Sequence, residues 1–162
     1  MTGKTHITAG TLACMALVIY ADYPIACIPL AMIGSILPDA DHKNSIISNI
    51  LPLYLITKHR GILHSIFIPL LLLPLSLPLS IGYLSHLVLD MMTTSGIKPL
   101  YPLYKKKFSI GLCTTGSTME KIINAIMLIS LIYLTTKFFL NVDFISYLKN
   151  LDLQNIFRNF AP

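Results

Sequence analysis

Residues 82–93 read Gly-Tyr-Leu-Ser-His-Leu-Val-Leu-Asp-Met-Met-Thr, and the interpretation of the whole chain starts from them. His86 and Asp90 stand four residues apart in a stretch that is otherwise almost wholly apolar, so a helix would carry both side chains on one face. An ionisable pair in an apolar helix is costly unless a metal, a partner or a substrate matches it. The stretch therefore predicts part of a metal site. The alternative is a buried His–Asp hydrogen bond that bridges two helices.

The composition indicates an integral membrane protein. The chain has 162 residues, of which 54% are hydrophobic and 12% are charged, whereas a soluble domain has about 25% charged residues. The net charge of +5 is spread over several loops, which suits contact with anionic lipid headgroups. With no nucleic-acid motif, we expect membrane lipids and no nucleic acid as partners. We expect Cys14, Cys27 and Cys113 to be buried small hydrophobes with no disulfide framework.

The apolar runs predict an all-α, polytopic membrane bundle of about four to five apolar helices. The first two runs have about 15 residues and fall short of the roughly 20 needed to cross a bilayer squarely, so they are either short spans or a partly inserted hairpin. We expect a membrane-embedded domain over residues 1–140 and an amphipathic surface helix over residues 141–162. The apolar runs cover residues 7–21, 25–37, 66–79, 81–92 and 122–140, the last being the best-formed span.

Pairing these runs as hairpins brings the polar islands of the chain to one face of the membrane. All five histidines and four of the seven acidic residues then lie on that face, together with most of the lysines. The positive-inside bias makes this face cytoplasmic. The sequence thus predicts a protein of a bacterial or archaeal cytoplasmic membrane, with its site facing the cytoplasm.

The first island contains Asp39, Asp41 and His42 at the end of an apolar run. Two carboxylates two residues apart cannot share a helix face, but a turn can bring them around one ion. Mixed oxygen and nitrogen ligands suit zinc, manganese or iron. The alternative is a solvated turn in which the aspartates act as caps.

The second island places His59 and His64 on either side of Arg60 and Gly61. The Arg60 guanidinium is a fork suited to phosphate or carboxylate. The alternative is a group of interfacial side chains that contact lipid headgroups.

Two further residues give weak signals when taken alone. His6 is a single histidine near the start of the chain, and Glu120 stands where a glutamate favours the helix dipole. Together, however, the islands contain five histidines and four carboxylates. This set exceeds one tetrahedral zinc site, so two metals, or one metal with an acid–base pair, fit better.

These motifs, in this order, resemble the bacterial YdjM-like family of inner-membrane, predicted metal-dependent hydrolases. The resemblance covers nearly residues 1–121. One departure is Leu63, which stands where the family pattern usually has a threonine; no metal ligand is lost by it. The matching stretches are His6, 37–42 (LPDADH), 59–65 (HRGILHS), 82–93 (GYLSHLVLDMMT), Gly96, 100–102, 108–110 and 116–120.

The resemblance implies that the residues of all these islands together form one set of metal ligands and catalytic residues. We expect one or two divalent ions, with zinc first and manganese or iron as alternatives. Arg60 would clamp an anion, and Asp41, Asp90 or Glu120 would be the general base. The expected metal ligands are His6, Asp39, Asp41, His42, His59, His64, His86 and Asp90.

The leading functional hypothesis is a hydrolase that cleaves a phosphoester of an amphiphilic, lipid-like substrate with a metal-activated water. A divalent-metal transporter or sensor is the second; transport sites lie near the bilayer midplane, often between repeats, whereas these residues stand at helix ends and no repeat is found. A third is a metal-free phosphatase that forms a phosphohistidine, with Arg60, His64, His86 and Asp90 in the roles. The fourth is a structural membrane protein with buried polar pairs.

Overall fold

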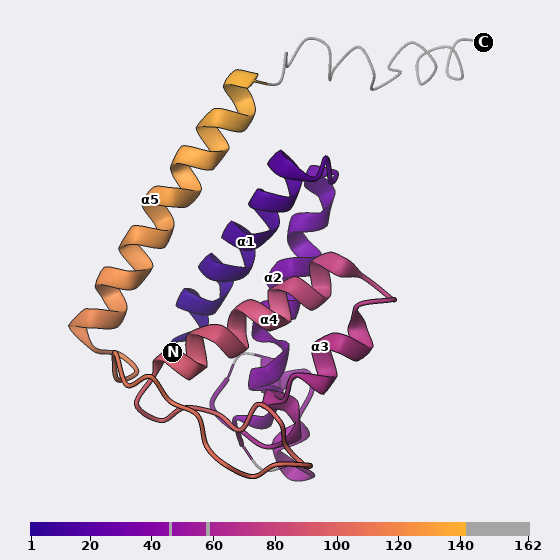
Figure 1. Ribbon diagram of the computed structural model, residues 1–162, viewed down its shortest axis with the longest axis vertical. Helices are drawn as coiled ribbons and strands as arrows, with labels where there is room; N and C mark the ends of the chain where they lie inside the picture. The colour runs from indigo at the N-terminus through magenta and orange to yellow at the C-terminus, as the bar shows by residue number, and fades with distance from the viewer. Residues whose placement is uncertain (46, 58, 142–162) are drawn as a thin grey trace.

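A computed structural model describes residues 1–45, 47–57 and 59–141 of the protein, and within these ranges the regular structure is helical, as predicted (Figure 1). In place of strands, these residues contain two isolated β-bridges, in the long loop between the last two helices. The α-helices are α1 (Gly3–Tyr20), α2 (Ile28–Ile36), α3 (Phe67–Leu72), α4 (Leu77–Met92) and α5 (Thr118–Asn141).

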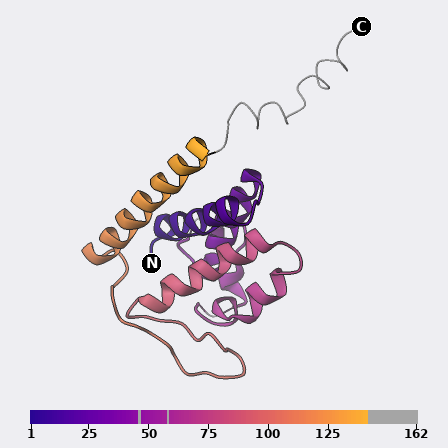
Figure 2. The same ribbon diagram turned by 45° about the horizontal axis from the view of Figure 1, so that its top comes forward.

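One helix of the described residues is long and apolar enough to cross a membrane. It is the stretch Thr118–Leu140 of α5, with 23 residues and a mean hydropathy of 1.8, and it includes the predicted span 122–140. In the two views of Figures 1 and 2, α5 lies alongside α1, outside the group formed by the other helices. Helix α2 has 9 residues, a length of only about 14 Å. The expected polytopic bundle of four to five spans therefore stays a prediction.

The prediction of one apolar span over residues 66–79 is wrong. Helix α3 ends at Leu72, a turn follows, and α4 begins at Leu77. The prolines explain the break, because Pro74 stands in the turn and Pro78 in the first turn of α4, where its missing N–H costs nothing. The Ser76 side chain caps α4 by accepting a hydrogen bond from the Leu79 amide. The predicted helix 81–92 is thus the later part of a longer one.

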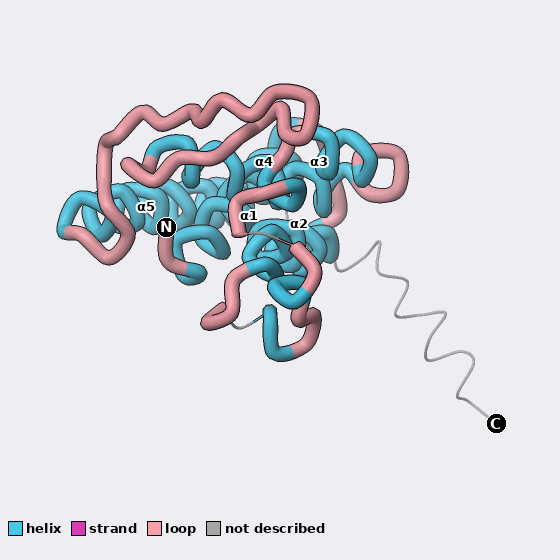
Figure 3. Tube along the Cα trace, turned by 90° about the horizontal axis from the view of Figure 1, so that it is seen from below, coloured by secondary structure: helices cyan, strands magenta, loops and turns pink. Residues whose placement is uncertain are grey.

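The loops gather at one end of the helices, as Figure 3 shows from below. The segment 45–57 contains two short 3-10 turns, Ile47–Asn49 and Leu53–Leu55. The loop from α4 to α5 is held by the bridges Thr93↔Cys113 and Ile97↔Phe108. The predicted amphipathic tail falls on residues 142–162, which lie outside the described residues, so the boundary near residue 140 stays a prediction.

Helices α2 and α4 cross at two glycines with their backbones almost in contact. A Cβ atom added to Gly82 would lie 2.0 Å from the carbonyl oxygen of Ala31, and one added to Gly34 would lie 2.1 Å from that of Leu79. Small residues allow this close approach between membrane helices. The crossing brings the end of α2 against the middle of α4.

The apolar packing continues on the other side of α2. Cys14 and Cys27 are buried with Val18 and Ala31 between α1 and α2, and their sulfur atoms lie 2.8 Å apart. All three cysteines are buried free thiols, as predicted.

We predict that Gly82→Ala prevents normal packing of α2 on α4, because the new methyl group would meet backbone that cannot rotate away. The expected cost is about 3 kcal/mol of unfolding free energy, the upper range for overpacking. Thermal unfolding in detergent, followed by circular dichroism, measures it. Gly3→Ala is the matched control, since nothing lies within 4 Å of its added Cβ. Equal stability of the two variants would contradict the crossing.

Candidate metal centre

Helix α4 contributes two fully buried polar side chains to the candidate site. The exposed fractions of His86 and Asp90 are 0% and 2%. The Nδ1 atom of His86 lies 2.7 Å from the carbonyl oxygen of Ser35, at the end of α2. A carbonyl only accepts, so Nδ1 carries the proton and Nε2 is left with its lone pair. The close helix crossing thus turns the unprotonated nitrogen of His86, which could bind a metal, toward Asp90 and the loops.

His64 reaches the same point from the short 3-10 turn Ile62–His64. Its Nε2 atom lies 3.3 Å from Nε2 of His86 and 3.5 Å from Oδ2 of Asp90. The Tyr83 hydroxyl donates a hydrogen bond to the carbonyl of Leu63. This bond ties the turn to α4, so α4 both supplies two site residues and holds the third.

The Asp41 carboxylate, at the end of the turn Leu37–Asp41, contacts the segment 59–64 with both oxygens. Oδ1 lies 2.7 Å from Nδ1 of His59, while Oδ2 accepts a hydrogen bond of 3.0 Å from the Arg60 amide. Oδ2 also lies 3.2 Å from Nδ1 of His64, as an ion pair. A carboxylate on Nδ1 orients an imidazole whose Nε2 faces a metal. Asp41 therefore acts on His64 as a positioning residue.

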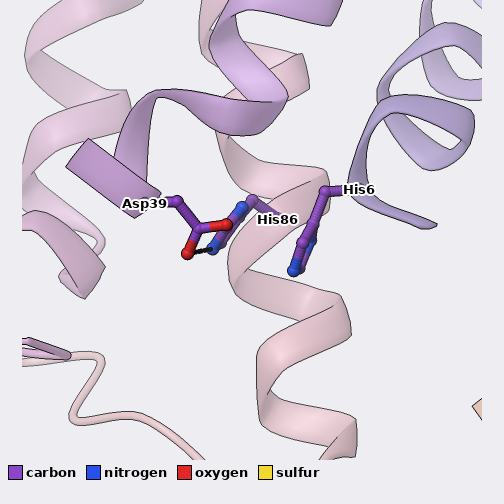
Figure 4. Close-up of side chains that lie close together, drawn as sticks. All are labelled: His6, Asp39 and His86. Carbon is purple, nitrogen blue, oxygen red and sulfur yellow. Dashed lines mark ion pairs between the residues drawn. The ribbon is translucent and has the colours of Figure 1, made fainter. Parts of the chain in front are cut away.

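Asp39 and His6 lie on opposite sides of the His86 ring (Figure 4). The Oδ1 atom of Asp39 is 3.7 Å from Nε2 of His86. The ring of His6, from the first turns of α1, stacks on that of His86 with centroids 3.7 Å apart and planes inclined by 14°. His6 Nε2 is also 3.5 Å from Oδ1 of Asp90. Residues distant in sequence thus surround one imidazole.

Seven of the eight predicted metal ligands fall into three overlapping triads, in each of which the ligand atoms lie within 4.8 Å of one another. His86 and His64 each belong to two triads, so the sets adjoin. The third triad has Nε2 of both histidines turned toward the Asp90 carboxylate. The triads are His6–Asp39–His86, Asp41–His59–His64 and His64–His86–Asp90.

The unpaired polar atoms of the site fit a bound cation. Neither ring nitrogen of His6 makes a hydrogen bond within the described part of the chain, although the side chain is fully buried. Buried polar groups are nearly always satisfied, so such a group of exceptions needs an explanation. Imidazole nitrogens and carboxylates around one point are the donor set of zinc, manganese or iron.

The pKa values of two loop residues also respond to the charge of this cluster. Burial raises the pKa of the Asp41 carboxyl, but its contacts with His59 and His64 outweigh that effect and hold the pKa below its ordinary value. Burial lowers the pKa of the His64 imidazole, but its contacts with Asp41 and Asp90 raise the pKa to about 9. The carboxylates thus attract positive charge to His64. A divalent cation would meet the same demand and displace the proton.

A cavity of about 650 Å³ opens onto the site. Asp39, Asp90 and Arg60 line it, together with His59. The Arg60 guanidinium lies 3.5 Å from Oδ2 of Asp90 and donates a 3.2 Å hydrogen bond to the carbonyl of Gly96. It is therefore held at the cavity wall beside the third triad, with the cavity large enough for a small-molecule substrate.

Two predicted residues are not brought into the triads. His42 is exposed; it lines the cavity and its ring centroid is 4.8 Å from that of His59. The carboxylate of Glu120 accepts hydrogen bonds from the amides of Thr2 and Gly116, both 2.6 Å long, and from the Thr5 hydroxyl at 2.7 Å. The donors Thr2 and Thr5 tie α5 to the beginning of α1. The role of Glu120 as a general base has no support from these contacts.

Sequence reasoning missed three groups that shape the site. The Ser35 carbonyl sets the tautomer of His86, and a backbone oxygen leaves no signal in a sequence. Lys4 lines the cavity, and its position two residues before His6 could have indicated this. The α-amino group of Met1 lies 2.7 Å from Oδ1 of Asp90, a contact that no sequence pattern announces.

Comparison with known proteins places the chain in a family context. Residues 1–146 match the family described as YdjM inner membrane protein. A Bacillus subtilis (strain 168) protein named uncharacterized protein YvsG is 32% identical over 141 residues, which cover 77% of this chain and 88% of that protein. The inner membrane proteins YdjM of Escherichia coli (strain K12) and Shigella flexneri are each 29% identical over 117 residues, 59% of this chain and 60% of theirs. No solved structure matches the chain significantly.

We predict that His86→Ala loses bound zinc, because it removes the nitrogen that two of the triads share. Metal analysis of the purified variant, with zinc titration after chelation, measures this. His42→Ala is the matched control, a histidine outside the triads, and we expect it to keep its zinc. Full zinc content in His86→Ala would mean that His86 of α4 is not central to zinc binding.

We predict that Asp41→Asn weakens zinc binding by about 10–100-fold without abolishing it, the usual effect of losing a group that orients a ligand. The amide keeps the shape of the carboxylate but not the charge that holds His59 and His64. Competition with a chelator of known affinity gives the constant. A complete loss of zinc would instead make Asp41 a direct ligand.

Proposed function

The chain belongs to the YdjM family of inner membrane proteins, and on this premise we propose that it is a membrane-bound, metal-dependent hydrolase that cleaves a phosphoester of an amphiphilic substrate. One observation carries the proposal: the Asp90 carboxylate of the triad His64–His86–Asp90 and the guanidinium of Arg60 line the same 650 Å³ cavity. A metal site beside a guanidinium and a cavity of substrate size provides the groups that phosphoester hydrolysis requires.

His64, His86 and Asp90 would hold the ion, with His6 and Asp39 adjacent to it. Three protein ligands leave a position open, as in catalytic zinc sites. A bound divalent ion would lower the pKa of a water and polarise a phosphoryl oxygen. Burial of the histidines keeps bulk water from competing, and the hydrogen bond to Ser35 keeps His86 in its binding tautomer.

Arg60 would bind the phosphoryl group. Its side chain is 19% exposed and already sits beside Asp90, so little ordering is needed when the substrate enters. A planar guanidinium can donate to two phosphoryl oxygens at once. The charge that develops on these oxygens in the transition state would strengthen both bonds.

We assign the general base to Asp39 rather than to Asp41, Asp90 or Glu120. The Asp39 carboxylate lines the cavity and accepts no hydrogen bond from the described residues; its ion pair among them is with His86, and a ring nitrogen of His6 lies within 4.8 Å. Asp41 and Glu120 are each held by several donors, and Asp90 faces the metal ligands. An oxygen of Asp39 would take the proton of the attacking water.

A transporter or sensor and a metal-free phosphohistidine phosphatase are the competing functions. The cavity beside the triads supports a substrate larger than a bare ion, and the phosphohistidine route gives Asp39 no role. Zinc flux into proteoliposomes without phosphate release would favour transport. Phosphate release that survives exhaustive chelation would favour the phosphohistidine route.

We predict that Arg60→Gln lowers kcat/KM for phosphatidic acid in mixed micelles by about 10²–10³-fold, the usual effect of losing one transition-state donor, while bound zinc is unchanged. Release of inorganic phosphate by protein loaded with zinc or manganese is the assay. Lys106→Gln, a loop cation that does not line the cavity, should leave the rate unchanged. Zinc-loaded wild-type protein that hydrolyses neither phosphatidic acid nor a phosphodiester lipid would reject the proposed function.

A further inference from the structure

The cavity beside the candidate metal centre continues onto an exposed apolar face of α2. Ile36, in the last turn of α2, lines the cavity. One turn earlier, Ile33 and Met32 are 48% and 36% exposed, and Pro29 is also exposed. Spacings of three, four and seven residues place these side chains on one face. We call Pro29, Met32, Ile33 and Ile36 the α2 strip.

Other lining residues of the cavity are charged. Lys4 and Arg60 belong to the lining, as do Asp39 and Asp90, and an ion in the candidate metal centre would add positive charge. The lining therefore contains two cationic side chains, and Ile36 joins it to the α2 strip. An occupant that matches both features has an anionic group attached directly to an apolar chain.

We propose that the substrate is a lipid phosphomonoester that enters sideways from the membrane, with its phosphate between Lys4 and Arg60 and its acyl chain along the α2 strip. A terminal phosphate carries two negative charges near neutral pH, which suits two cations and an ion better than a singly charged diester does. The chemical step rests on the proposed function, but the binding of the lipid does not.

Side entry also explains why the α2 strip is uncovered. A soluble phosphoester would need only the charged residues of the cavity lining, and Met32 and Ile33 would then serve no purpose in recognition. Burial of apolar carbon on exposed isoleucine stabilises binding in proportion to the area buried. The α2 strip thus selects for an acyl chain, and Lys4 and Arg60 select for the phosphate head group.

The chain contains no tryptophan, so a single indole can report which lipid lies on the strip. Ile33→Trp would be placed in nanodiscs of phosphatidylcholine that contain either brominated phosphatidic acid or brominated phosphatidylcholine. The matched control is Ile132→Trp on α5, an apolar residue that is 66% exposed and far from the cavity lining. Met32→Trp is the second reporter if Ile33→Trp does not fold.

At position 33 we expect half-maximal quenching at an about tenfold lower mole fraction of brominated phosphatidic acid than of brominated phosphatidylcholine, the effect of about one hydrogen bond to a charged group. At position 132 the two lipids should quench equally. Adding Arg60→Gln to Ile33→Trp should remove the preference, because the head group loses its clamp.

Equal quenching by both lipids at position 33 would overturn the inference, since the strip would then face bulk bilayer. Absence of quenching by either lipid would also overturn it, because residues 142–162, a second copy or water would then cover the strip. A preference for phosphatidic acid without phosphate release would keep the inference and reject the hydrolase. Phosphate release without a preference for phosphatidic acid would reject the inference and keep the hydrolase.

Discussion

The close crossing of α2 and α4 is the constraint on which the site depends. Backbone meets backbone at Gly34 and Gly82, so the two helices have one relative position and no side chain between them to adjust it. One residue beyond the first glycine, the Ser35 carbonyl meets His86. One turn further, Asp39 meets the same ring from the cavity side. A wider crossing would separate the ligands and leave His86 with the choice of either tautomer.

Carboxylates and histidines can lie in the apolar surroundings of this site because they pair with one another. Asp41 holds His59 and His64 from outside, while Asp90 faces His6, His64 and His86 from within. Buried charges are costly unless they are paired, and this pairing leaves the nitrogen lone pairs pointing inward. The arrangement separates the residues that hold the imidazoles from those that would face the proposed ion.

The sequence predicted much of the site, because acidic residues and histidines are scarce in an apolar chain and are retained at a cost. The face shared by His86 and Asp90 followed from their spacing alone. Which residues orient the imidazoles and which would face an ion did not follow from the sequence. That division depends on which ring nitrogen meets Asp41 or Ser35. The contacts of Glu120 could not be predicted, because two of its donors, Thr2 and Gly116, are backbone amides. The break at residues 73–76 required weighing Pro74 against a strongly apolar context, and hydropathy favoured a continuous span.

The hydrogen bonds of Glu120 have a consequence for the depth of the histidine cluster in a membrane. They join the first residues of α1 to the beginning of α5, the helix long enough to cross a bilayer. The depth of α5 is set by the thickness of the hydrocarbon layer, and Glu120 transmits that depth to His6, one residue beyond Thr5. A shift of α5 along the bilayer normal would therefore carry the buried histidine of α1 with it.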